Sequence, residues 1–271
     1  MQGIETFIPT ATKVRYINQL LKVGFDTIDF GSFVSPKAIP QMKDTKEVLA
    51  QLDLSSSTTK LLAIVANVRG AEEASRHQEI NYLGFPFSIS ETFQQRNTNK
   101  SISEAMDNLK EIQNLSLRSN KVLVTYISMG FGNPYGDPYN ETVVQEFIGL
   151  LNEIGVTIIS LADTIGVSNV DNIKRLFSNA IASFPHIEFG AHLHSNPNSA
   201  YEKIAAALQA GCTRFDGALK GFGGCPMAED DLVGNIATET IIKCLSDFNF
   251  STTINQGQFD KAYGMTSQVM G

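Results

Sequence analysis

Short apolar, β-branched runs alternate with longer amphipathic stretches along most of this chain, and this alternation is its most constraining feature. It is typical of a parallel sheet built from strand–helix units, because a parallel strand needs a crossover before the next strand begins. The runs with strand character begin at Phe25, Lys60, Ile80, Lys121, Thr157, Glu188 and Arg214. We expect seven strands, each followed by a helix.

Signals for helix ends lie in the intervals between these runs. Ser101 and Glu104 have the spacing of a capping box, and the Asn196–Pro197 pair fits an N-cap followed by proline at the first helical position. Gly155 suits the end of a helix. These signals support helices in the intervals.

The fold class that fits best is an α/β protein with a (β/α)8 TIM barrel, although an open doubly wound sheet would give similar strands. One strand is missing at the front, because Met1 leads into a helix predicted from about Thr10 to Val23 with no β-like segment before it. A barrel lacking one strand would leave two exposed edges. We therefore expect the natural product to extend upstream of Met1. The alternatives are an irregular first strand or an open sheet.

Composition limits the classes of partner. A chain of 271 residues with 42% hydrophobic content can bury a core within one domain, and no linker divides residues 1–271. The net charge of -7 argues against binding nucleic acid or an anionic membrane. No apolar run approaches the roughly 20 residues that cross a bilayer. Three cysteines are too few for a disulfide framework, so we expect free thiols and a cytoplasmic location.

Polar residues end or follow several of the predicted strands, on the face where barrel enzymes carry their active sites. They are Asp29, Ser32, Asn67, Tyr126, Ser128, Asp163, Thr164, His192, His194, Asp216 and Lys220. A single Asp or Asn at such a position more often caps a helix or holds a turn than binds a ligand. Each alone is therefore a weak candidate.

The pair His192 and His194 is a stronger candidate. Successive side chains of a strand alternate faces, so the two imidazoles project the same way and Leu193 the other. Two neutral imidazoles suit a transition metal, and carboxylate and amide oxygens nearby suit Mg2+ or Mn2+. The pair predicts a metal site.

A glycine-rich segment ends at Cys225 and Pro226, where the backbone can approach a substrate closely and bend sharply. The thiol could exchange a proton with a carbon acid, although a small buried cysteine is the commoner fate of this residue. Glu229, Asp230 and Asp231 follow, either as part of a lid or as a solvated acidic turn.

Taken together, these segments resemble the hydroxymethylglutaryl-CoA lyases of the DRE-TIM metallolyase superfamily, whose barrels cleave or form carbon–carbon bonds next to acyl-CoA. The matching stretches are SFVSPKAIPQM from Ser32, SLADTIGV from Ser160, GAHLH from Gly190, GFGGCP from Gly221 and GNIATE from Gly234. The resemblance runs the whole length of the chain, and it implies a homodimer and a place in ketone-body formation and leucine degradation.

The resemblance also implies roles for individual residues. His192, His194 and Asn235 would be metal ligands, and Cys225 would be the catalytic thiol on a mobile loop. Asp29 occupies the position of a family glutamate near the reacting centre. Asp163 occupies that of a family aspartate near the substrate.

The implied reaction cleaves 3-hydroxy-3-methylglutaryl-CoA to acetoacetate and acetyl-CoA. A divalent cation, Mg2+ or Mn2+, would lower the pKa of the tertiary hydroxyl, and a base would remove its proton. Cys225, or a histidine such as His192, would protonate the acetyl-CoA enolate. Lys37, Arg96 and Lys100 are candidates for the CoA phosphates on charge alone, and the strand-end residues Ser32, Asn67, Tyr126, Ser128 and Thr164 complete the predicted substrate contacts.

The chain also departs from the family. Members carry an Arg-Asp pair a few residues before the position of Gln2, with the Asp on the metal and the Arg at the enolate, and here that pair would lie upstream of Met1. Ser195 replaces an Asp of many relatives, and the loop from Cys225 to Asn235 is one residue longer than in some. Two alternatives follow: a related metal-dependent aldolase or acyl-CoA Claisen condensing enzyme, or an acyl-CoA-binding barrel inactive without Arg-Asp.

Overall fold

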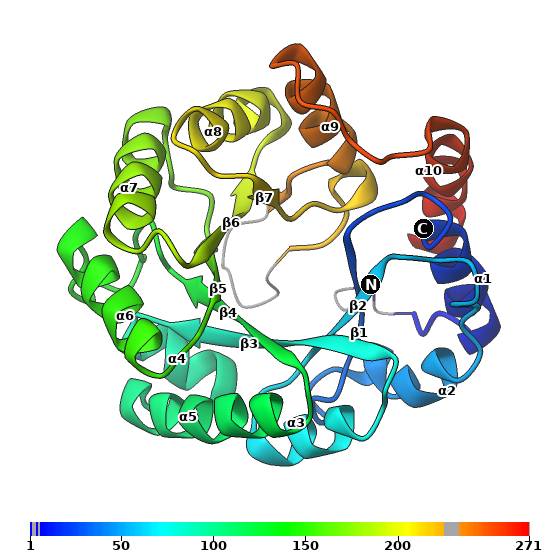
Figure 1. The fold of residues 1–271 in the computed structure, drawn as a ribbon, viewed down its shortest axis with the longest axis horizontal. Helices are drawn as coiled ribbons and strands as arrows, with labels where there is room; N and C mark the ends of the chain where they lie inside the picture. The colour runs from blue at the N-terminus through cyan, green and yellow to red at the C-terminus, as the bar shows by residue number, and fades with distance from the viewer. Residues whose placement is uncertain (2–3, 5, 225–232, 271) are drawn as a thin grey trace.

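A curled sheet of parallel strands surrounded by helices forms the body of the molecule (Figure 1). The computed structural model describes residues 1, 4, 6–224 and 233–270. The parallel strands are β1 (Thr27–Ser32), β2 (Lys60–Ile64), β3 (Ile80–Ser88), β4 (Val122–Ser128), β5 (Ile158–Asp163), β6 (Glu188–Ser195) and β7 (Arg214–Phe215). They pair in sequence order, and β8 (Gly234–Asn235) pairs antiparallel with β6. All seven predicted strands are therefore confirmed.

The helices lie outside this sheet and connect its strands (Figure 1). They are α1 (Thr10–Leu20), α2 (Thr45–Leu49), α3 (Val68–Ser75), α4 (Glu91–Thr98), α5 (Ile102–Arg118), α6 (Glu141–Glu153), α7 (Val170–Ser183), α8 (Pro197–Gln209), α9 (Thr238–Asp247) and α10 (Gln256–Met270). Two short 3-10 turns are η1 (Pro40–Met42) and η2 (Leu219–Gly221). Among the helices of the described residues, none is long and apolar enough to cross a membrane.

The expected helix-end signals operate as predicted. Ser101 and Glu104 form a reciprocal capping box at the start of α5. The Asn196 side chain accepts hydrogen bonds from the first turn of α8, where Pro197 has no N–H to satisfy. Gly155, with φ +87°, follows the end of α6 in the left-handed region. These local signals fix where the helices turn back to the sheet.

The opening of the barrel lies between its first and last parallel strands. No hydrogen-bonded pairing joins β7 to β1 within the described ranges. On this side α10 packs against α1, where Tyr16 Oη lies 2.9 Å from Thr266 Oγ1. The ring of Phe259 also meets Phe25 edge-to-face. The two terminal helices thus lie side by side next to the opening (Figure 1).

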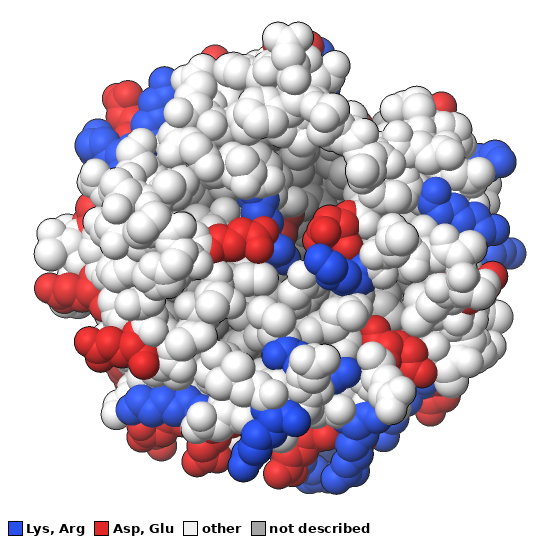
Figure 2. Space-filling view, viewed as in Figure 1, with Lys and Arg blue, Asp and Glu red and all other residues white. Residues whose placement is uncertain are grey.

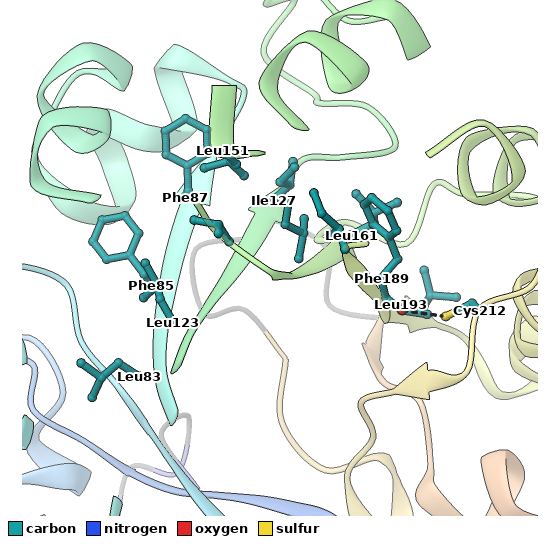
Figure 3. Close-up of a cluster of buried hydrophobic side chains, with 14 of the residues drawn as sticks. Leu83, Phe85, Phe87, Leu123, Ile127, Leu151, Leu161, Phe189, Leu193 and Cys212 are labelled. Carbon is teal, nitrogen blue, oxygen red and sulfur yellow. Dashed lines mark hydrogen bonds between the residues drawn. The ribbon is translucent and has the colours of Figure 1, made fainter. Parts of the chain in front are cut away.

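Two apolar layers hold the sheet, one on each face. The larger lies between the sheet and the helices, and Figure 3 shows part of it, including Phe85, Phe87, Leu161 and Leu193. The smaller fills the inside of the barrel with Leu62, Tyr82, Val124 and Ile158. Because Leu193 belongs to the outer layer, the alternation of β6 turns its two histidines toward the barrel interior.

Candidate active site

His192 and His194 lie together at the carboxyl end of β6. Their ring centroids are 5.5 Å apart, with the planes tilted by 54°. Leu193 between them is 2% exposed and packs outward against the helices. The side-by-side placement predicted from strand alternation is therefore present in the structure.

His194 is buried and held in one orientation. Its Nδ1–H donates to the backbone carbonyl of Thr164 at 2.9 Å, which leaves the lone pair of the neutral ring on Nε2. Burial, followed by the neighbouring His192, lowers the pKa of His194 to about 4. The ring is therefore neutral near pH 7, the form that binds metals.

Asn235 lies against His194 because β8 returns beside β6. The two residues are paired in the antiparallel register, and their side chains share a hydrogen bond. The Asn235 Nδ2 donates to Phe222 O at 3.1 Å, which directs Oδ1 away from that carbonyl. His192 and Asn235 thus both lie next to His194 at the barrel rim.

Close contacts with Asn235 explain why glycines precede Cys225. A Cβ on Gly221 would lie 2.9 Å from the backbone oxygen of Asn235, and one on Gly223 would lie 3.1 Å from its Nδ2. Both glycines have positive φ, at +68° and +88°. Cys225 itself, with Glu229, Asp230 and Asp231, lies outside the described residues.

His192 has a carboxylate partner that the sequence did not assign. Its Nδ1 lies 3.2 Å from Asp216 Oδ2, just beyond the end of β7. The Tyr126 ring meets the His192 ring edge-on, with centroids 5.4 Å apart. Asp216 was noted only as a polar residue of the last strand, because nothing local relates it to a residue 24 positions earlier.

Asp29 points inward from β1 toward the same region. The residue as a whole is exposed to solvent. Desolvation of its carboxyl group by the surrounding protein raises the pKa of Asp29 to about 7; the amino terminus lowers it, Asp216 raises it further and His192 lowers it. A carboxyl that titrates near neutrality can accept a proton from a substrate.

Asp163 has a different environment from the one expected. Its side chain is fully buried, and its Oδ2 accepts hydrogen bonds from Lys203 Nζ at 2.9 Å and from the backbone N and the hydroxyl of Ser168. Asp163 Oδ2 is thus hydrogen-bonded to Lys203 and Ser168 of the protein. The surroundings of Asp163 favour a role in holding the end of β5.

Other predicted contacts have local partners. Asn67 is the N-cap of α3 and accepts from Gly70 N at 2.9 Å. Ser32 Oγ accepts from Val34 N, and Thr164 Oγ1 accepts from Met129 N. Ser128 is buried at the end of β4. The structure thus uses Asn67 as a cap and Ser32 in a strand-end turn, whereas Thr164 orients His194 through its carbonyl.

The basic candidates lie on the rim. Lys37 is exposed after β1, Arg96 stacks on the Tyr135 ring at 4.7 Å, and Lys100 follows α4. The surface is hollowed at the centre of the ring of helices, with acidic and basic side chains around the hollow (Figure 2). Arg96 and Lys100 both follow β3, so they lie on the same sector of the rim.

Comparison with known proteins identifies the family of this chain. The HMGL-like family model matches residues 1–265. The chain belongs to the HMGL-like family. The motif resemblance to hydroxymethylglutaryl-CoA lyases is confirmed by relatives of that name. One is the lyase YngG of Bacillus subtilis, 34% identical over all of this chain and 90% of its own length. Another is the human cytoplasmic 3-hydroxy-3-methylglutaryl-CoA lyase, 32% identical over 94% of this chain and 68% of its own.

Solved structures of proteins named HMG-CoA lyase confirm the TIM-barrel class. The HMG-CoA lyase from Bacillus subtilis, 34% identical, superposes with a TM-score of 0.92 over 100% of this chain and 90% of its own. The HMG-CoA lyase from Brucella melitensis, 28% identical, superposes with a TM-score of 0.91 over 99% of this chain and 94% of its own. The HMG-CoA lyase from Acinetobacter baumannii, in complex with coenzyme A and 3-methylmalate, is 29% identical. It superposes with a TM-score of 0.90 over 100% of this chain and 87% of its own.

Proposed function

We propose that this protein is a divalent-metal-dependent carbon–carbon lyase that cleaves 3-hydroxy-3-methylglutaryl-CoA to acetoacetate and acetyl-CoA. Membership of the HMGL-like family and relatives named for this activity support it. The observation that carries it is the placement of His192 and Asn235 on either side of His194 at the rim.

The donor set fits Mg2+ or Mn2+. Nδ1 of each ring has an oxygen partner, which leaves Nε2 as the nitrogen that each ring can offer to a cation. Asn235 adds a hard amide oxygen, as these ions prefer. The described part of the chain holds no group of three or more His, Cys, Asp or Glu side chains able to bind a metal, so the proposed donor set depends on the Asn235 amide. A three-donor site leaves coordination positions for substrate oxygens.

When bound, the cation would polarise the substrate hydroxyl and offset the negative charge of the enolate. Asp29, whose pKa lies at about 7, is suited to take the hydroxyl proton. Asp216 keeps the Nδ1 proton of His192 in place, so that this ring presents Nε2 to the site. We assign protonation of the acetyl-CoA carbon to Cys225, the next residue after a glycine run that lies against Asn235.

For the CoA portion we propose contacts from Lys37, Arg96 and Lys100. Phosphate groups need basic partners, and Arg96 and Lys100 share one sector of the rim. A relative in complex with coenzyme A supports a CoA-binding role for this family. We also propose that the enzyme is a cytoplasmic homodimer, as the family resemblance implies.

The test is an assay of acetoacetate release from 3-hydroxy-3-methylglutaryl-CoA with added Mg2+ or Mn2+. It should be run with each metal in turn and with a chelator in place of metal. Metal-dependent release supports the lyase. Inactivity with both metals, together with intact Mn2+ binding, would favour a related aldolase or Claisen enzyme on another substrate.

A further inference from the structure

Lys203 is a buried lysine on α8, the helix that follows the two histidines. It is 4% exposed, and its ammonium group contacts three oxygens. Nζ lies 2.9 Å from Asp163 Oδ2, 3.0 Å from Gly166 O and 3.0 Å from His194 O. A buried ammonium is costly unless it is paired and fully hydrogen-bonded, and here all three of its donors are used.

The three acceptors come from separate segments at the carboxyl end of the barrel. Asp163 ends β5, Gly166 lies in the loop between β5 and α7, and His194 lies near the end of β6. One ammonium therefore links the ends of two neighbouring strands and the loop between them. Asp163 also receives the backbone N–H and hydroxyl of Ser168, which closes the same loop.

This linkage controls both the backbone and the ring of His194. Lys203 holds the His194 carbonyl directly. The ring nitrogen Nδ1 donates to Thr164 O, and Thr164 lies between Asp163 and Gly166, the other two residues that Lys203 holds. A shift of this loop would move the acceptor that orients the ring.

The same loop also supports Asn235. Gly166 has φ +71°, and a Cβ built on it would lie 2.3 Å from Cγ1 of Val233. Val233 immediately precedes β8, which carries Asn235. The loop that Lys203 fixes is therefore packed against the segment that brings the amide oxygen to His194.

We propose that Lys203 is a positioning residue of the metal site. With Asp163 it forms a buried ion pair that sets the orientation of His194 and the position of β8. The inference rests on the proposed function in so far as it names the metal. It also reassigns Asp163 from substrate contact to support of the metal ligands.

The chain offers a matched control. Lys13 and Asp44 form a second buried lysine–aspartate pair, with Nζ 2.6 Å from Oδ1 and both side chains at most 9% exposed. This pair joins α1 to the start of α2, on a different side of the barrel from β6 (Figure 1). It shares the cost and the stabilising contacts of a buried pair but has no contact with His194.

The test compares the double variants Lys203→Met/Asp163→Asn and Lys13→Met/Asp44→Asn with the wild type. Removing both charges avoids the unpaired buried carboxylate that Lys203→Met alone would leave, and the amide oxygen introduced at position 163 can still accept from Ser168. The first readout is the 15N NMR spectrum of the His194 ring in metal-free protein, which reports the Nδ1–H form. The second is the dissociation constant for Mn2+ by calorimetry.

We expect the Lys203 pair variant to show a mixed ring form and to bind Mn2+ about 10 to 100 times more weakly, as for other partners of metal ligands. The Lys13 pair variant should match the wild type in both readouts. A wild-type ring spectrum with Mn2+ affinity within about twofold in the Lys203 variant, or equal losses in the control, would overturn the proposal. If the wild type binds no Mn2+, the proposed function fails, and the ring spectrum alone decides whether Lys203 orients His194.

Discussion

Asp216 Oδ2 lies 3.2 Å from His192 Nδ1, so a carboxylate stands behind one of the two histidines of the site. Ser160 Oγ donates to the same oxygen at 3.4 Å, which fixes the carboxylate in turn. A carboxylate in this position selects the Nδ1–H form of the ring and turns Nε2 toward the barrel interior. His194 reaches the same state by a different route, through the carbonyl of Thr164.

Replacing Asp216 by Asn should therefore weaken metal binding without unfolding the protein. The amide keeps the shape of the side chain but removes the charge that fixes the ring form of His192. We expect the dissociation constant for Mn2+ to rise about 10 to 100 times, measured by calorimetry. Asp247→Asn, which alters an exposed carboxylate paired with Lys243, is the control and should leave the constant unchanged. Equal affinities for both variants would contradict the role of Asp216.

His194 itself gives a direct test of the metal site. His194→Ala removes one of three donors, so Mn2+ binding should be lost and acetoacetate release should fall by at least about 100-fold, since the cation would supply most of the charge stabilisation. His186→Ala is the control, because His186 is exposed and bonded to Asn152 at the surface. A His194→Ala protein that still binds Mn2+ like the control would exclude this residue as a ligand.

The fold and the paired histidines were predictable because their signals are local. Strand alternation placed His192 and His194 on one face, and capping signals marked the starts of α5 and α8. The partners of these histidines were not predictable, since Asp216 and Thr164 reach them from other strands. A sequence window cannot show such contacts.

Three individual residues show the limits of reasoning from local sequence patterns. Lys203 lies in a helix beside Glu202, so its pattern is that of a solvated face, and only the packing of α8 shows that it is buried. Asn67 proved to be a helix cap, the reading that usually holds for a single strand-end Asn. Asn235 lies in the two-residue strand β8, which is too short to have a periodic pattern, so only the family resemblance singled it out.

The lowered pKa of His194 predicts a specific pH dependence of stability. The ring has a pKa of about 4 in the folded protein and about 6.5 when unfolded, so the unfolded chain binds the proton more tightly. The contribution is fully present above pH 6.5 and is lost as the pH falls toward 4. It should amount to roughly 3 kcal/mol, at about 1.4 kcal/mol per pKa unit.

Urea unfolding of wild type and His194→Gln between pH 7 and pH 4 measures this contribution. The glutamine variant has no ring to titrate, so its free energy of unfolding should fall less over this range. If both proteins lost stability in parallel, His194 would not be the group that couples folding to pH. Metal-free protein should be used, because bound metal would add its own pH dependence.

Gly166 and Gly136 provide a matched pair for testing the loop that supports β8. Both have positive φ, at +71° and +75°, so alanine at either position costs roughly 1 kcal/mol or more in backbone strain. At Gly136 a Cβ would meet nothing within 4 Å, whereas at Gly166 it would lie 2.3 Å from Val233 Cγ1. Gly166→Ala should therefore lose an additional 1 to 3 kcal/mol or so of unfolding free energy to overpacking, measured by urea denaturation. Because Val233 leads into β8, Gly166→Ala should also weaken Mn2+ binding through Asn235, and Gly136→Ala should not. Equal effects of the two substitutions would show that the contact with Val233 does not hold β8 in place.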